Sequence, residues 1–94
     1  MDRAIITVLG KDTIGIIAGV STYLAQQRVN ILDISQTIVD GFFNMMMIVD
    51  ISGLSEKGLS FHELAETLES IGRDQIGVQI KCQKEEIFDQ MHRI

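Results

Sequence analysis

Four residues that can bind a small polar molecule lie in two short segments of the first third of the chain. Asp12 and Thr13 precede Gly15, and Asn30 follows a run rich in apolar residues. The Asp12 carboxylate can accept a hydrogen bond from an amino group, whereas Thr13 and Asn30 can both donate and accept. A helix that begins beside Gly15 would present free N–H groups and the positive end of its dipole to a carboxylate. These groups suit a ligand that carries a carboxylate and an amino group.

Each of these residues also has a structural interpretation, and the sequence leaves both interpretations open. Asp12 or Thr13 can simply cap the first helix. Gly15 can allow that helix to pack closely on a sheet, and Asn30 can end the helix in a left-handed conformation. Lys11, beside them, can be a solvated loop charge.

The glycine-rich segment does not match the phosphate-binding loops. A P-loop requires Gly-x-x-x-x-Gly-Lys-Ser/Thr, whereas GKDTIG is followed here by Ile16 and Ile17. A dinucleotide fingerprint fails because the glycines of GIIAG have the wrong spacing. The segment also contains no cysteine or histidine to hold a metal. We therefore expect neither a metal nor a cofactor.

The residues that could perform catalysis are scattered. His62 and His92 have no nucleophile near them in the sequence. The carboxylates Asp33, Asp40 and Asp50 are likewise separated, with no sign of the pairing that acid–base catalysis requires. We expect that this protein is not an enzyme.

The composition indicates one small acidic domain. The chain has 94 residues, 46% of them apolar, and a net charge of −5. That charge repels phosphate backbones, so nucleic acid is not an expected partner. No leader is visible, and no apolar run approaches the roughly 20 residues that span a bilayer, so we expect a cytoplasmic protein without a membrane partner. The single cysteine, Cys82, fits a reducing compartment and is expected to be a small buried residue.

Hydrophobic periodicity predicts seven elements in the order strand, helix, strand, strand, helix, strand and terminal helix. Asp40-Gly41 joins the second and third strands as a two-residue hairpin turn. Ser60 and Glu63 form a capping box at the second helix, and Gly72 is expected to end that helix. The expected ranges are 4–10, 11–28, two strands within 30–51, 60–72, 77–83 and 84–94.

This order predicts an α+β fold, a ferredoxin-like βαββαβ plait with a four-stranded antiparallel sheet and two helices on one face. The first and third strands are apolar on both faces and should be central, with the other two at the edges. Phe42, Met46 and Ile48 would then form an apolar patch on the uncovered face. Either this patch or the free edge of the second strand predicts a homodimer. The amphipathic helix at 84–94 is expected to pack on the domain or on the dimer partner.

The segment VLGKDTIGIIAGVSTYLAQQRVNILDISQTIVDGFFNMMMIVDI resembles the ACT domain family of small regulatory modules. The shared pattern is an apolar strand, Gly-x-Asp-x-x-Gly-Ile, a helix that ends in Asn-Ile-x-Asp, and an apolar hairpin. It covers residues 3–83 well, so we assign 1–83 as the domain. The whole chain resembles standalone bacterial and archaeal members, which are similar to the ACT modules of the glycine-cleavage repressor and formyltetrahydrofolate deformylase. Many relatives have Arg-Pro where this chain has Thr13-Ile14, which places the loop geometry in question but not the fold.

The resemblance implies a regulatory domain that binds a small molecule, often an amino acid, where two domains meet in a homodimer. A further protein partner would read the bound state, because the chain has no output domain of its own. The alternative is a protein-interaction or dimerisation module without a metabolite ligand. The family contacts, transferred to matching positions, are Lys11, Asp12, Thr13, Gly15, Ile16, Asn30 and Ile31.

Overall fold

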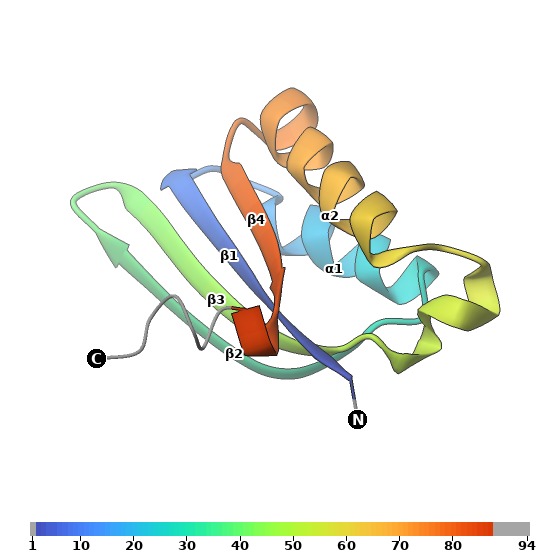
Figure 1. The fold of residues 1–94 in the computed structure, drawn as a ribbon. Helices are drawn as coiled ribbons and strands as arrows, with labels where there is room; N and C mark the ends of the chain where they lie inside the picture. Colours follow the sequence, from blue (N-terminus) through green and yellow to red (C-terminus); the bar gives the residue numbers. More distant parts are fainter. Residues whose placement is uncertain (1, 88–94) are drawn as a thin grey trace.

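The computed structural model describes residues 2–87 (Figure 1). Its strands are β1 (Arg3–Lys11), β2 (Asn30–Val39), β3 (Phe42–Asp50) and β4 (Gln79–Lys84). Its α-helices are α1 (Ile16–Gln26) and α2 (Phe61–Ser70); a 3₁₀ helix (Ser52–Lys57) precedes α2 and a π-helix (Ile71–Ile76) follows it. This βαββαβ order confirms the predicted α+β ferredoxin-like fold.

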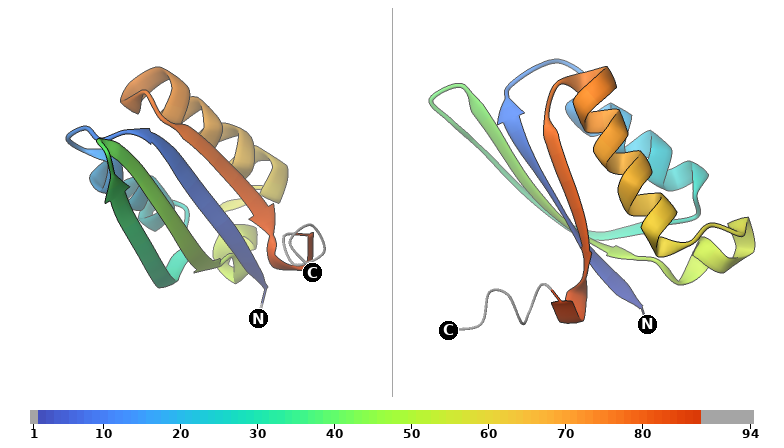
Figure 2. Two further views of the ribbon diagram at one scale, coloured as in Figure 1. Left: turned by 90° about the vertical axis from the view of Figure 1, so that its left-hand side faces the viewer. Right: turned by 45° about the horizontal axis from the view of Figure 1, so that its top comes forward.

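The four strands form one antiparallel sheet in the order β2-β3-β1-β4. The apolar strands β1 and β3 are therefore central and the mixed strands β2 and β4 are edges, as the sequence predicts. Both α-helices lie on the same face of the sheet (Figures 1 and 2). We call the opposite face, which neither α1 nor α2 covers, the open face.

The hydrophobic core lies between the sheet and the two helices. Alternate residues of each strand point toward the helices, which explains why buried positions recur every second residue along β3 and, apart from the additional buried residue Ile5, along β1. The helices contribute one stripe each, spaced by four residues. The fully buried members include Ile6, Val8, Met45, Met47, Val20, Leu24, Leu64, Leu68 and Ile80.

Helix α1 begins later than the sequence suggests. Its N-cap is Gly15, with φ 90°, and no side chain caps it, so the expectation that Asp12 or Thr13 caps the helix is wrong. Strand β1 continues to Lys11, and the Asp12 N–H donates to Gly41 O at 2.9 Å, which keeps this segment extended beyond the expected boundary. At the other end the left-handed residue is Arg28, with φ 63°, so Asn30 does not have the helix-ending role considered for it.

Helix α2 begins as predicted but ends differently. Glu63 N–H donates to Ser60 Oγ at 3.1 Å, and Ser60 N–H donates to Glu63 Oε1 at 3.3 Å, which confirms the capping box. Gly72, expected at the helix end, instead lies buried within the π-helix. A Cβ at Gly72 would lie 2.7 Å from Ile80 Cγ1, so glycine is needed there for close contact with β4. The helical segment ends at Gly77, whose N–H donates to Gly72 O.

The remaining connections are the β2–β3 turn and the segment after β4. Asp40 and Gly41 both have positive φ, 51° and 80°, which confirms the tight turn between β2 and β3. A helical turn at 85–87 follows β4, and residues 88–94 of the expected terminal helix lie outside the described residues.

Candidate functional site

The loop after β1 lies at the hairpin end of the sheet. Lys11 is paired with Phe42, and Asp12 is tied to the turn through Gly41. The side chains of Lys11, Asp12 and Thr13 are exposed, and Ile14 is 100% exposed. A fully exposed isoleucine has no folding role in a single chain, so this loop is available for a contact with another molecule.

The start of α1 adds main-chain donors to this loop. Because no side chain caps the helix, its first-turn N–H groups have no side-chain acceptor. A Cβ at Gly15 would have no heavy atom within 4 Å, so this glycine is required by its backbone angle and not by close packing. Ile16 is buried in the core, so only its main chain can reach a ligand.

Asn30 and Ile31 lie at the opposite end of the sheet. Asn30 is paired with Asp50, whereas Lys11 is paired with Phe42, at the other end of β3. The length of strand β3 separates these positions, a distance of roughly 26 Å. The structure therefore brings Lys11, Asp12, Thr13 and the start of α1 together but does not bring Asn30 and Ile31 to them.

A carboxylate that the sequence analysis did not select stands beside Asn30. Asp50 Oδ1 accepts hydrogen bonds from Ser52 Oγ at 2.6 Å and from Ser52 N–H at 2.9 Å. These bonds, the hydroxyl first, lower the pKa of Asp50 below its ordinary value. The predicted two-residue turn alone would place Asp50 opposite Ile31, and the bulge at Ile31–Asp33, for which the sequence gives no signal, shifts its partner to Asn30.

The outer edge of β2 carries unpaired main-chain groups. Hydrogen bonds from Asp12 N–H to Gly41 O and from Ile51 N–H to Asp2 O, both 2.9 Å, show that odd-numbered residues of β3 bond to β1. The even-numbered residues of β3 therefore direct their main-chain N–H and C=O groups toward β2. Beyond a bulge at Ile31–Asp33 they pair there with odd-numbered residues of β2. The β2 residues that direct their N–H and C=O groups outward are Ile34, Gln36 and Ile38.

One of these edge amides is occupied by a side chain. Ile34 N–H donates to Asp33 Oδ1 at 2.8 Å, which agrees with its outward direction. β-Bulges and charged side chains at a sheet edge commonly protect that edge from indiscriminate pairing with other strands.

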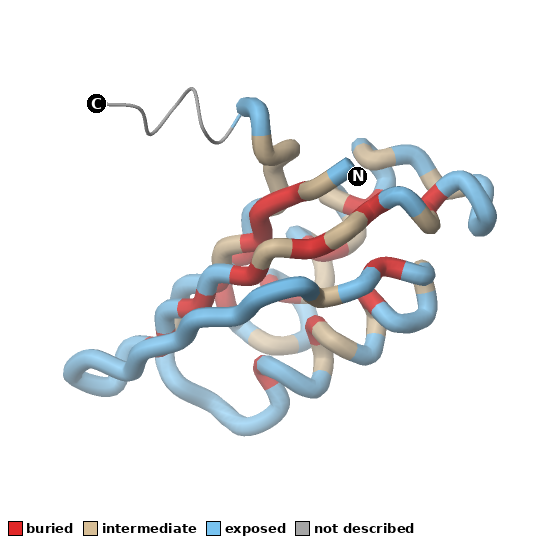
Figure 3. The backbone as a smooth tube through the Cα atoms, turned by 90° about the horizontal axis from the view of Figure 1, so that it is seen from below, coloured by how far each residue is buried: buried red, intermediate tan, exposed pale blue. Residues whose placement is uncertain are grey.

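Apolar side chains line the edge of β2 on its helix side. Ile34 and Ile38 face the same side of the sheet as the core but are 42% and 56% exposed. Ile17 is 40% exposed, and it points away from α2, because the groove between the helices is lined by Ala18, Gly19 and other residues of α1. We call Ile17, Ile34 and Ile38 the edge patch; Figure 3 shows β2 exposed along almost its whole length.

The open face also carries exposed apolar residues. Phe42, Met46 and Ile48 point to it, as expected, and Leu9 stands beside them. Phe42 and Met46 are exposed and Ile48 is half-buried. Their common face is as predicted, and their use as a dimer interface stays a prediction.

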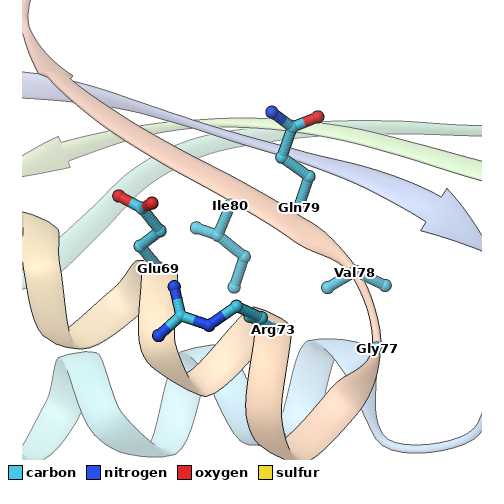
Figure 4. A pocket seen from close by; sticks show the side chains of 6 residues that line it. All are labelled: Glu69, Arg73, Gly77, Val78, Gln79 and Ile80. Carbon is cyan, nitrogen blue, oxygen red and sulfur yellow. The ribbon is translucent and has the colours of Figure 1, made fainter.

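The larger clefts do not coincide with the candidate residues. One of about 380 Å³ lies between the end of α2 and β4 and is lined by Glu69, Arg73, Val78, Gln79 and Ile80, of which Ile80 points toward Arg73 and Gln79 points away from the helix (Figure 4). Arg73 already bonds to Asp74 and Ser70, and Val78 and Ile80 are almost fully buried, so this cleft offers little free surface. A second groove, about 600 Å³, lies between α1 and α2.

The described residues show no arrangement typical of catalysis or metal binding. His62 lies on α2, where its Nε2 is 3.0 Å from the Glu66 carboxylate, and both side chains are largely exposed; His92 lies outside the described residues. Burial raises the pKa of the Cys82 thiol to about 12, which makes it a poor nucleophile. Within residues 2–87 there is no group of three or more potential metal ligands. No helix in this part of the chain is long and apolar enough to cross a membrane.

Comparison with known proteins finds full-length relatives. The ACT domain family model matches residues 2–83. The UPF0237 protein of Bifidobacterium longum is 60% identical over 94 residues, which is all of both chains. An ACT domain protein from Streptococcus pneumoniae, of solved structure, is 42% identical, with a TM-score of 0.77 over 94% of each chain.

Two multidomain proteins share the fold at lower identity. A putative glycine cleavage system transcriptional repressor is 20% identical, with a TM-score of 0.72 over 88% of this chain and 45% of its own. A formyltetrahydrofolate deformylase from Pseudomonas syringae pv. tomato is also 20% identical, with a TM-score of 0.77 over 89% of this chain and 28% of its own. These similarities support the resemblance in fold that the sequence suggested.

Proposed function

The chain belongs to the ACT domain family. From that premise we propose that it is a regulatory domain that binds an amino acid at the interface of a homodimer. The observation that carries the proposal is the position of the two groups of candidate residues. Lys11, Asp12 and Thr13 lie at one end of β2, and Asn30 and Ile31 lie at the other.

Pairing of two β2 edges would bring these groups together. Two copies related by a two-fold axis pair their edge strands antiparallel, so the start of one β2 lies beside the end of the other. Asn30 and Ile31 of the second copy then approach the loop that holds Asp12 and Gly15 of the first. Each dimer has two such sites, and neither is complete in one chain.

The edge of β2 has the properties that such an interface needs. Its outward N–H and C=O groups can form a continuous eight-stranded sheet. The edge patch would be buried against the second copy, which removes apolar surface from water. The Asp33 carboxylate must release Ile34 N–H when the strands pair.

The chemistry of the composite site suits an amino acid. The uncapped first turn of α1 can donate to the ligand carboxylate. Asp12 can accept from the ligand ammonium group, Thr13 can donate or accept, and Asn30 of the second copy can do both. Lys11 adds a positive charge at the mouth of the site.

The first experiment is a thermal-shift and calorimetric screen of the twenty amino acids. A saturable shift that is lost in Asp12→Ala and in Asn30→Ala is expected, whereas Glu66→Ala, which removes an exposed carboxylate on α2, should bind as the wild type does. A stable dimer that binds none of the amino acids at millimolar concentration would favour the alternative, a protein-interaction module without a metabolite ligand.

Mixing the two inactive variants tests the composite site directly. A mixed dimer of Asp12→Ala and Asn30→Ala has one site with both defects and one site with none. Free exchange of an equal mixture therefore restores about a quarter of the wild-type binding capacity. If subunits exchange and no binding returns, the two residues do not act across the interface.

A further inference from the structure

The open face is covered unevenly. Ile5 points to it from β1, yet this residue is only 6% exposed. Ile48, beside Ile5, is half-buried, whereas Met46 is 42% and Leu9 is 52% exposed. Burial thus decreases along the sheet from the start of β1 toward the hairpin, in the direction away from the end of β4.

The chain leaves β4 on this same side. Lys84 is paired with Ala4, so β4 ends beside the start of β1. Arg3 points to the open face, as Ile5 does two residues later, and its guanidinium forms an ion pair with Glu85. The helical turn at 85–87 therefore begins at the covered end of the open face, close to the start of β1 (Figure 2).

The sequence beyond this turn is suited to an apolar surface. Ile87 is 49% exposed and is the first member of a stripe that continues with Met91 and Ile94 at helical spacing. As a helix, the seven residues from 88 to 94 would add roughly 10 Å. Ile5 and Leu9 are separated along β1 by roughly 13 Å. The segment can thus cover Ile5, Ile48 and Met46 but not Phe42 at the hairpin end.

We propose that residues 85–94 dock as an amphipathic helix on the open face of their own sheet, over Ile5, Ile48 and Met46. The occupant is the same chain because the turn at 85–87 follows β4 directly and is already held at this face by the ion pair of Arg3 with Glu85. The proposal does not depend on a ligand. It assigns the covered part of the open face to the tail and leaves the β2 edge for the second copy.

The run Met45-Met46-Met47 supplies an internal measurement. Met46 points to the open face, whereas Met45 and Met47 are buried on the helix side. In full-length protein labelled with ¹³C at the methionine methyl groups, Met91→Glu should shift the Met46 methyl signal and leave those of Met45 and Met47 in place. Peroxide should then oxidise Met46 severalfold faster.

A matched variant completes this measurement. His92→Glu adds the same side chain on the other side of the predicted helix, and it should leave both Met46 measurements unchanged. An unchanged Met46 in Met91→Glu, or an equal effect of the two variants, overturns the proposal.

A mixing experiment identifies the chain that the tail covers. A spin label is attached to the single thiol of the double variant Cys82→Ala/Ile94→Cys, which places the label at the last position of the tail. The label should broaden the Met46 signal of its own chain. Broadening in an unlabelled partner chain of mixed dimers, and not in the labelled chain itself, would instead show exchange of the tail between copies and overturn the proposal.

Discussion

Replacement of Gln36 by proline tests the proposed dimer at the point where it is most specific. The N–H of Gln36 points outward from β2, as the phase of the sheet hydrogen bonds and the Ile34–Asp33 contact both indicate. Proline is tolerated on an edge strand when its missing N–H faces solvent. The Gln36→Pro variant should therefore fold as the wild type does, and only the pairing of two β2 edges should be weakened.

The size of the effect follows from the two-fold symmetry. Each dimer loses two donors, each worth about 1 kcal/mol net, and leaves two carbonyl groups without partners at about 1 kcal/mol or more each. The total of roughly 4 kcal/mol corresponds to a dissociation constant that rises about a thousandfold. Sedimentation equilibrium should therefore cover about three decades of protein concentration, starting at the dissociation constant measured for the wild type.

The neighbouring residue is the control. Thr37 directs its N–H toward β3, so Thr37→Pro removes a bond of the sheet itself and should unfold the chain or destabilise it strongly. Urea unfolding and far-ultraviolet circular dichroism separate these two outcomes. If Gln36→Pro is folded and dimerises as tightly as the wild type, then β2 is not the interface, and the argument for a composite site across it is refuted.

Three further predictions concern single positions. Gly72→Ala should lower the free energy of unfolding by about 3 kcal/mol, because its methyl group would meet Val78 O and Ile80 Cγ1 at 2.7 Å. The control Gly58→Ala has no atom within 4 Å of the new methyl group and should lower the free energy of unfolding by about 1–2 kcal/mol, because of its φ of 62°. Equal losses for the two variants in urea unfolding would contradict the close packing at Gly72. The Cys82 thiol should react with iodoacetamide at pH 8 far more slowly than an unfolded thiol, because its pKa is raised to about 12. Its contribution to the free energy of unfolding is present below pH 9 and is lost as pH rises above 9, where the unfolded thiol ionises first. If a Cys82→Ala variant loses the same stability from pH 8 to 10, Cys82 is not the cause of that loss. Ser52→Ala should raise the pKa of Asp50 toward its ordinary value in an NMR titration, since the hydroxyl and amide of Ser52 stabilise the ionised form; the wild-type contribution is present above the unfolded pKa and is lost as pH falls.

The order of strands in the sheet was predictable because the share of polar residues in a strand reflects how far that strand is buried. β3 is apolar on nearly all positions, and β2 carries Asp33, Ser35 and Thr37 on one face, so the first had to be central and the second an edge. The capping box of α2 was predictable for a similar reason, since the Ser60 and Glu63 side chains act on amides only three residues away.

The start of α1 was not predictable from residue types. Asp12 and Thr13 are good N-cap residues in isolation, but a long-range bond from Asp12 N–H to Gly41 keeps the chain in the sheet past Lys11. The helix could then begin only at Gly15, where the backbone turns with a positive φ. A tertiary contact here overrides the local preference.

The separation of the two groups of candidate residues follows from topology rather than from spacing. Asn30 lies close to Gly15 in the sequence, but α1 runs back along the sheet, so the residues before and after it stand at opposite ends. A sequence motif that spans a whole helix therefore combines residues that lie at opposite ends of the sheet.

That separation has a consequence for how a cell would use the protein. If ligand binds across the proposed dimer interface, a monomer holds only part of the binding groups and binds weakly, so the sensitivity of such a receptor depends on its own abundance. Halving expression would lower the fraction of assembled receptor as well as the number of receptors, and ligand would in turn recruit monomers into dimers. On the proposed arrangement, the response to a metabolite becomes a response to gene dosage.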